Sequence, residues 1–251
     1  MAEPVPSARA LVIVPTYNER DNIRATVAAV LDAVPDAHLL IVDDSSPDGT
    51  GAIADELAAA DTRIEVLHRA EKQGLGAAYV AGFTWALERD FGVVVEMDAD
   101  GSHPASALPA LLTAVDVGAA LAIGSRWVPG GSVVNWPRRR EAISRAGNWY
   151  ARSMLRLRVR DVTAGYRAFP AGVLRSIHTD SLHSRGYCFQ IETTLRVHDA
   201  GGRIVEVPIE FREREHGESK MSTGIVAEAM LKVTQWGLAR LVGLGRFSGA
   251  T

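Results

Sequence analysis

Two aspartates, Asp98 and Asp100, follow directly on an apolar run, and their spacing suits the binding of a divalent cation. Two carboxylates that lie two residues apart on a turn can face one metal ion. Mg²⁺ and Mn²⁺ prefer such oxygen ligands and keep coordination positions open for substrate phosphates. Ser102 or His103 could complete or orient the site. An Asp-x-Asp pair is also common in solvated turns, so this reading needs support from elsewhere in the chain.

A second acidic pair, Asp43 and Asp44, also follows an apolar run. If both runs are strands of one sheet, their ends lie close together and like charges converge on one crevice. Such crowding costs stability unless a cation or hydrogen-bond donors compensate it. The two pairs together therefore favour a metal site over two unrelated solvated turns.

Glycine-rich phosphate-binding motifs are missing from the sequence. It contains no G-x-x-x-x-G-K-[ST] motif, and no G-x-G-x-x-G follows the first apolar run. Phosphates must then be neutralised by the metal and by basic side chains. The candidates are Arg126, Arg138, Arg139, Arg140, Arg167, Arg212, Arg214 and Lys220.

Patterns of nucleophilic or zinc catalysis do not stand out either. No Ser-His-Asp or Cys-His arrangement is evident, and the seven histidines show no H-E-x-x-H spacing, which argues against a zinc hydrolase. The single cysteine, Cys188, lies between two aromatic residues and is predicted to be a buried, inert thiol.

Alternating strands and helices are expected to position these residues. Short apolar strands separated by helices indicate a mostly parallel, doubly wound sheet, and ligands bind beyond the carboxyl ends of such strands. The polar clusters at 15–19, 43–48, 98–102 and 125–126 all fall at strand ends. The predicted strands are 10–14, 39–42, 64–67, 93–97 and 119–123, followed by a turn-and-strand segment at 161–169 and a strand at 203–211 in which Pro208 suggests an edge or a bulge. The predicted helices are 22–34, 50–60, 76–89, a helix that Pro104 begins, 139–157, 187–200 and 223–243.

Composition sets the class of protein. The chain has 251 residues, 47% of them apolar, and shows no linker or repeat, so we expect one compact domain over 1–251. One cysteine excludes a disulfide framework and favours a cytoplasmic protein. The sequence predicts neither a signal peptide nor a membrane-spanning helix, because no 18 consecutive residues are apolar.

The charge is distributed unevenly along the chain. Residues 1–125 carry 7 basic and 19 acidic side chains, whereas residues 126–175 carry 11 arginines and 2 acids. The acidic first half argues against nucleic-acid binding. The basic block fits a phosphate group, a polyanion or an anionic membrane surface, or else it is a solvated arginine-rich helix. Only three lysines occur beside 24 arginines, so each lysine merits inspection.

Five segments of the sequence together resemble a known family. The chain closely resembles the polyprenol-phosphate mannose synthases, relatives of the dolichol-phosphate mannose synthases in the inverting glycosyltransferase family 2, over about residues 10–235. The segments are VPTYNE at 14–19, VDDSSPDGT at 42–50, MDADGSHP at 97–104, DVTAGYR at 161–167 and GESKM at 217–221.

The resemblance implies an α/β protein with a GT-A fold, that is, a Rossmann-like doubly wound mixed sheet flanked by helices, with a C-terminal amphipathic helix. Residues 10–126 would form the half that binds nucleotide-sugar and metal, and residues 127–251 the acceptor-binding half. The roles it implies are GDP-mannose binding by Pro15, Tyr17, Glu19, Val42, Asp44, Asp98, Ala99, Asp100, Arg126, Arg214 and Lys220; metal binding (Mg²⁺ or Mn²⁺) by Asp98, Asp100 and Ser102; catalysis by Asp100, Arg126, Arg214 and Lys220; and acceptor-phosphate binding by Arg140 and Ser219.

The implied reaction is transfer of mannose from GDP-mannose to a polyprenyl phosphate with inversion at the anomeric carbon. A phosphomonoester is largely dianionic at neutral pH and needs no general base, whereas a hydroxyl acceptor usually requires one. Three alternatives stay open: a polyprenyl-phosphate glucosyltransferase that uses UDP-glucose, a family-2 transferase with a hydroxyl acceptor, and an inactive nucleotide-sugar sensor.

The lipid acceptor implies work at a membrane. The C-terminal helix and the arginine block at 138–160 could dock on the cytoplasmic face of the plasma membrane, or the helix could pack in the core. A separate membrane-spanning partner protein is a further expectation from the resemblance. The alanine- and arginine-rich composition suggests a bacterium with GC-rich DNA, in which a long acceptor such as decaprenyl phosphate is expected.

Overall fold

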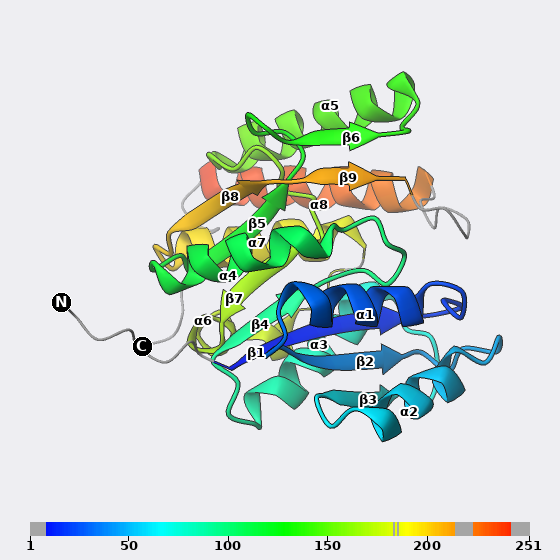
Figure 1. Cartoon of the computed structure of the whole chain (residues 1–251). Coiled ribbons are helices and arrows are strands. Elements are labelled where there is room, and N and C mark those ends of the chain that lie inside the picture. Colours follow the sequence, from blue (N-terminus) through cyan, green and yellow to red (C-terminus); the bar gives the residue numbers. More distant parts are fainter. Residues whose placement is uncertain (1–8, 183, 185, 214–222, 242–251) are drawn as a thin grey trace.

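A mixed seven-stranded sheet forms the centre of the computed structural model, which describes residues 9–182, 184, 186–213 and 223–241 (Figure 1). The strand order is β3-β2-β1-β4-β7-β5-β8; only β7 runs antiparallel to its neighbours. The strands are β1 (Ala10–Thr16), β2 (His38–Asp43), β3 (Ile64–His68), β4 (Val93–Glu96), β5 (Leu121–Ser125), β7 (Arg167–Pro170) and β8 (Ile204–Pro208). A separate parallel pair consists of β6 (Ser132–Val134) and β9 (Glu210–Arg212).

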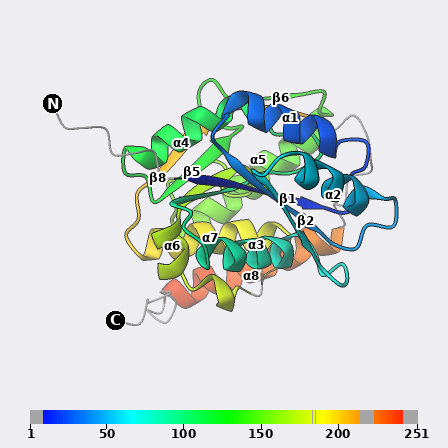
Figure 2. The same cartoon turned by 60° about the horizontal axis from the view of Figure 1, so that its bottom comes forward.

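Helices cover both faces of the sheet (Figure 2). On one face lie α1 (Ile23–Ala33), α2 (Thr50–Ala60) and α4 (Leu108–Asp116). On the other face lie α3 (Leu75–Leu87), α6 (Ala171–Ser176) and α7 (Tyr187–Asp199), and α8 (Thr223–Leu241) packs against α7 and against α5 (Arg138–Leu155). This arrangement confirms the expected doubly wound α/β fold with a helix near the C-terminus.

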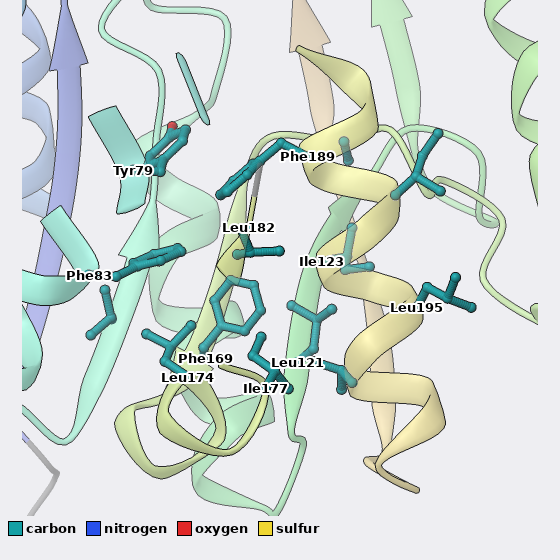
Figure 3. Packing of buried hydrophobic residues seen from close by; sticks show 14 of the residues in the cluster. Tyr79, Phe83, Leu121, Ile123, Phe169, Leu174, Ile177, Leu182, Phe189 and Leu195 are labelled. Atoms are coloured by element: carbon teal, nitrogen blue, oxygen red, sulfur yellow. The ribbon is translucent and has the colours of Figure 1, made fainter. Parts of the chain in front are cut away.

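The strands read as continuous apolar runs because both of their faces are covered. In β4, Val93 and Val95 pack with the α1 and α4 side chains, while Val94 packs with those of α3 and α7. Figure 3 shows the hydrophobic cluster on the α3 and α7 side of the sheet. In it, Phe83, Phe169 and other side chains fill the space between the sheet and the helices.

The second half departs from the sequence prediction at several points. The single strand predicted at 203–211 is split, because Pro208 has no N–H for the ladder and the chain leaves the main sheet after it. Pro104 precedes a short 3₁₀ turn (Ala105–Ala107) instead of lying in the first turn of α4. Neither β6 nor α6 was predicted, because three and six residues are too few to show a period.

Among the described residues, no helix combines the length and the apolar character that crossing a bilayer requires.

Candidate functional site

The four polar clusters predicted at strand ends lie along one edge of the sheet. β1, β2 and β4 are parallel, and β5 is parallel to β4 because β7 is antiparallel to both of them. Direct bonds join the first two clusters: Thr16 Oγ1 donates to Asp43 Oδ1 over 2.9 Å, and the Asp44 N–H donates to the Thr16 carbonyl over 3.0 Å. This edge therefore brings together the two acidic pairs, Asp43 with Asp44 and Asp98 with Asp100.

The turn after β4 holds Asp100 in a fixed orientation. Ser102 donates to Asp100 Oδ1 from its backbone N–H over 3.1 Å and from its hydroxyl over 2.6 Å. Gly101 has φ +73°, a left-handed conformation that glycine adopts without strain. The hydroxyl of Thr26 on α1 donates to the Ala99 carbonyl over 2.8 Å and anchors the turn to that helix.

Asp98 is held from two sides. The Tyr79 hydroxyl donates to Asp98 Oδ1 over 3.2 Å, and the Asp98 N–H donates to His103 Nδ1 over 3.0 Å. The buried His103 ring stacks on Tyr166 with 5.0 Å between the ring centroids and meets Phe211 edge-on. The Asp98 side chain is 31% exposed, so it faces outward from this rigid base.

The donor set of this turn fits Mg²⁺ or Mn²⁺. Asp98 and Asp100 offer carboxylate oxygens, and Ser102 offers a hydroxyl whose hydrogen bond goes to Asp100. No group of three His, Cys, Asp or Glu side chains positioned to hold a metal occurs in the described part of the chain. A cation held by two carboxylates must complete its shell with water and substrate phosphates, which is the usual habit of Mg²⁺.

A basic loop borders the acidic edge. Arg69 Nη1 lies 2.5 Å from Asp44 Oδ1, and both side chains are largely buried. Burial raises the pKa of Asp44, while the Arg69 charge opposes that rise. Lys72 Nζ lies 3.8 Å from the centre of the Tyr17 ring, a cation–π contact. Arg69, Ala70, Glu71 and Gln73 line a hollow of about 350 Å³.

The remaining residues proposed for the nucleotide lie nearby with different exposure. Glu19 accepts from Asn22 Nδ2 over 2.8 Å, and its backbone N–H donates to Thr50 Oγ1 over 2.9 Å. Pro15 pairs in register with Val42 at the ends of β1 and β2. The Val42 side chain is fully buried in the core, so only its backbone can meet a ligand.

Arg126, at the end of β5, is engaged inside the protein. Its Nε and Nη2 atoms donate to the two oxygens of Asp161 over 2.7 and 2.6 Å, and Nη2 also reaches Thr163 Oγ1 over 3.1 Å. Asp161 is fully buried and Arg126 nearly so. This bidentate pair joins the β5 edge to the loop that precedes β7.

Aromatic rings surround Arg126. Its guanidinium carbon lies 5.3 to 5.5 Å from the ring centres of Trp127, Trp136 and Phe211. The indole nitrogens of both tryptophans are buried and have no hydrogen-bond partner among the described residues. Arg140 lies 4.1 Å from the centre of the Trp136 ring and forms an ion pair with Glu213. Of the three adjacent arginines at the start of α5, only Arg140 is half-buried here.

Arg167 is not a phosphate ligand, which corrects its place among the candidates. It is fully buried and donates to the carbonyls of Val162, Ala164 and Gln190 and to Thr193 Oγ1. Burial lowers its pKa to about 10, against the charge of Glu96, its register partner on β4. Burial also raises the pKa of Glu96 to about 8, although Arg167 opposes this rise.

Three predicted residues, Arg214, Ser219 and Lys220, lie outside the described residues. Arg212 is exposed and pairs with Glu210 on the same strand. Sequence reasoning missed the roles of several residues in the site, namely Arg69, Lys72, Tyr79, Trp127 and Phe211. Only Lys72 gave a signal, because lysine is so scarce in this chain.

Comparisons with known proteins place this geometry. The family model described as "Glycosyl transferase family 2" matches residues 11–180. The chain is 56% identical to a polyprenol monophosphomannose synthase of Mycolicibacterium smegmatis, over 93% of this chain and 88% of that protein. It is 58% identical to an undecaprenyl-phosphate mannosyltransferase of Micrococcus luteus, over 92% of this chain and 95% of that protein.

The fold also matches solved structures. A glucosyl-3-phosphoglycerate synthase of Mycobacterium tuberculosis, solved with Mn²⁺ and UDP, superposes with a TM-score of 0.62 at 19% identity, covering 95% of this chain and 80% of that one. This likeness supports the GT-A arrangement of sheet and helices and is too distant in sequence to carry more.

Proposed function

The chain belongs to glycosyl transferase family 2, and we propose that it transfers mannose from GDP-mannose to a polyprenyl phosphate with inversion, giving polyprenyl-phosphate mannose and GDP. The observation that carries this proposal is the near full-length similarity, at 56% and 58% identity, to two proteins named for mannose transfer to polyprenyl phosphates. Both proposed halves, 10–126 and 127–251, contribute strands to one sheet, so we treat 1–251 as one catalytic unit.

GDP-mannose would lie along the acidic edge. The nucleoside would contact Pro15, Tyr17 and Glu19, the Val42 backbone and Asp44, with the diphosphate at the turn formed by Asp98, Ala99 and Asp100. Tyr17 is covered by Lys72, and Asp44 is paired with Arg69, so both are held in place before a ligand arrives. Such preorganisation lowers the entropy cost of binding.

Asp98 and Asp100 would hold a divalent cation, with Ser102 as a further ligand or as the donor that orients Asp100. When bound, the cation supplies neutralisation of the negative charge that grows on the departing diphosphate. Arg126, Arg214 and Lys220 would add positive charge at the same place. In this proposal the protein binds the diphosphate and lowers the basicity of the leaving group.

The acceptor phosphate would supply the nucleophile. Its oxygen forms the new bond to the anomeric carbon while the bond to the GDP oxygen breaks, so the carbon inverts. Because a phosphomonoester is already ionised at neutral pH, no side chain has to remove a proton. Arg140, fixed between Trp136 and Glu213, would bind the acceptor phosphate together with Ser219.

A stripe on α5 would bring the enzyme to its lipid. Arg138, Arg145, Trp149 and Arg152 are spaced by seven, four and three residues and therefore share one side of the helix. Trp149 is 66% exposed, while Ala151 and Leu155 on the opposite side are buried. Arginine with an interfacial tryptophan suits an anionic bilayer surface. We infer peripheral docking of this stripe on the cytoplasmic face of the plasma membrane.

Donor and acceptor are tested in one matrix. Radiolabelled GDP-mannose or UDP-glucose is supplied with a polyprenyl phosphate or with the matching polyprenol, and label is counted in the organic phase. We expect label only from GDP-mannose with the lipid phosphate, and a product of inverted anomeric configuration by NMR. Product formed from UDP-glucose and not from GDP-mannose contradicts GDP-mannose as the donor. Transfer to the polyprenol contradicts the acceptor. Nucleotide-sugar binding without any product indicates a sensor.

A further inference from the structure

Tyr79 is a buried tyrosine whose hydroxyl leaves the apolar core for the candidate metal site. It lies on α3, is fully buried, and donates to Asp98 Oδ1 over 3.2 Å. In Figure 3 its ring lies at the edge of the aromatic cluster near Phe83 and Phe189, with its oxygen directed away from them. A phenylalanine would fill the same space in the core, so packing alone does not explain the hydroxyl at this position.

The ring has little freedom to move. It stacks with Phe189 at 6.0 Å and an interplanar angle of 9°, and with Phe83 at 6.3 Å and 24°. Helix α3, which carries Tyr79, packs closely against the sheet. A Cβ at Gly82 on this helix would come within 2.8 Å of the Ile13 side chain on β1. A tyrosine anchored in this way presents its hydroxyl at one place, and its rotamer is fixed by the core.

Asp98 and Asp100 are held in the same manner. The Oδ1 atom of Asp98 accepts from the Tyr79 hydroxyl, and the Oδ1 atom of Asp100 accepts from the Ser102 hydroxyl. A phenol O–H can donate a hydrogen bond whereas an ionised carboxylate only accepts, so Tyr79 is the donor of this pair. Partners of this kind orient metal-binding carboxylates and tune their affinity.

We propose that Tyr79 is a positioning residue for the metal site: its hydroxyl fixes the orientation of the Asp98 carboxylate and thereby sets the affinity for the divalent cation. This inference rests on the proposed metal-dependent transfer. Ser102 performs the same service for Asp100 from within the turn, whereas Tyr79 reaches Asp98 from a different element, 19 residues away.

The direct test measures Mn²⁺ binding to the full chain without substrates. The concentration of free Mn²⁺ is read from its electron paramagnetic resonance signal. Tyr79→Phe keeps the stacked ring and removes only the donor. We expect about a 10-fold weaker Mn²⁺ affinity. In transfer assays the Mn²⁺ concentration for half-maximal rate should rise by the same factor, while kcat at saturating Mn²⁺ stays near that of the unmodified chain.

Tyr150→Phe is the matched control. Its hydroxyl bonds to Thr234 Oγ1 over 2.6 Å between α5 and α8, so the same chemical change there should leave Mn²⁺ affinity unaltered. Asp98→Asn supplies a second check: in that background Tyr79→Phe should add no further loss, because the carboxylate it orients is gone. For any variant of reduced stability, the increase in melting temperature on adding Mn²⁺ is compared instead. We expect it to rank the variants in the same order of Mn²⁺ affinity.

Two outcomes separate the inference from the proposal beneath it. Equal Mn²⁺ affinity in Tyr79→Phe and in a metal-binding unmodified chain overturns the role of Tyr79 and leaves the metal site standing. A chain that binds no Mn²⁺ with all residues intact overturns the metal-dependent function, and this inference with it.

Discussion

The acidic edge at the ends of β1, β2 and β4 differs in construction from the arginine–aromatic region, which consists of Arg126 with Trp127, Trp136, Phe211 and the segments that hold them. At the acidic edge, two carboxylates accept from hydroxyls two or three residues away, Asp43 from Ser46 and Asp100 from Ser102. Thr16 and Tyr79 add hydrogen bonds to Asp43 and Asp98 from other elements. In the second region the partners are distant in sequence: Arg126 and Asp161 are 35 residues apart, and Ser125 and Glu206 are 81 apart. Local turns therefore contribute to the positioning of carboxylates in the first region, whereas the second depends on contacts between distant segments.

The two regions should therefore tolerate different substitutions. A local turn keeps its geometry when a neighbouring side chain changes, so substitutions at the acidic edge should affect ligands more than folding. A buried ion pair loses its balance when one partner is removed, so substitutions around Arg126 should affect folding first.

Asp100→Asn should have the largest effect, and it should fall on activity. Removing a carboxylate that would hold the cation, and with it the neutralisation of the negative charge growing on the diphosphate, is expected to lower kcat by about 10³-fold, while the melting temperature changes little. Initial rates of lipid-linked product give the readout. Asp116→Asn, at the exposed end of α4, is the control and should act at the normal rate. A variant of Asp100 that is unfolded would contradict the local character of this edge.

Asp161→Asn should reverse that balance. It removes the buried partner of Arg126, and we expect the free energy of unfolding to fall by about 3 to 5 kcal/mol. Urea denaturation measures the loss. Glu56→Gln breaks the exposed pair with Arg24 and should cost less than about 1 kcal/mol. Equal costs for the buried and exposed pairs would end the distinction between the two regions.

The buried carboxyl group of Glu96 should make the free energy of unfolding depend on pH. Burial raises its folded pKa from 4.5 to about 8, so the unfolded chain releases this proton first as pH rises. The free energy of unfolding should therefore fall between about pH 4.5 and pH 8 and level off above. Glu96→Gln has no proton to lose, so its stability relative to the unmodified chain should rise across this window by on the order of a few kcal/mol.

Denaturation of both proteins at pH 5 and pH 8, in buffer containing EDTA, checks this. Parallel stabilities at the two pH values would mean that Glu96 is ionised in the folded protein.

Arg152→Glu should have the smallest effect. Reversing one charge on the α5 stripe changes the charge by two units. At roughly 1 kcal/mol for each unit of charge near the surface, binding to anionic vesicles is expected to weaken by about 30-fold. Co-sedimentation with phosphatidylglycerol vesicles measures it. Arg24→Glu, on α1 across the sheet, is the matched control. If both reversals weaken binding equally, the attraction follows net charge and the stripe has no special part.

The first half was largely predictable from sequence, because its strands and its carboxylates are close together along the chain. Its strands bury both faces and read as apolar runs, and its carboxylates follow those runs directly. The second half was harder, because β6 and β9 are three residues each and pair with one another from far apart.

Individual side chains show the same limit. In the sequence Tyr79 has the position of an ordinary core aromatic within the helix predicted at 76–89. Only the packing of α3 across β4 brings its hydroxyl to Asp98. Arg167 was misjudged for the opposite reason: an arginine in a basic block suggests a surface, but the fold buries it beneath carbonyls from two segments.

We propose that the acidic edge and the arginine–aromatic region together perform one metal-dependent mannosyl transfer. Its most direct test is the formation of labelled mannolipid from GDP-mannose and a polyprenyl phosphate, first with Mg²⁺ or Mn²⁺ and then with EDTA. We expect product with metal, none after chelation, and recovery when metal is restored. Equal product formation in EDTA would contradict it.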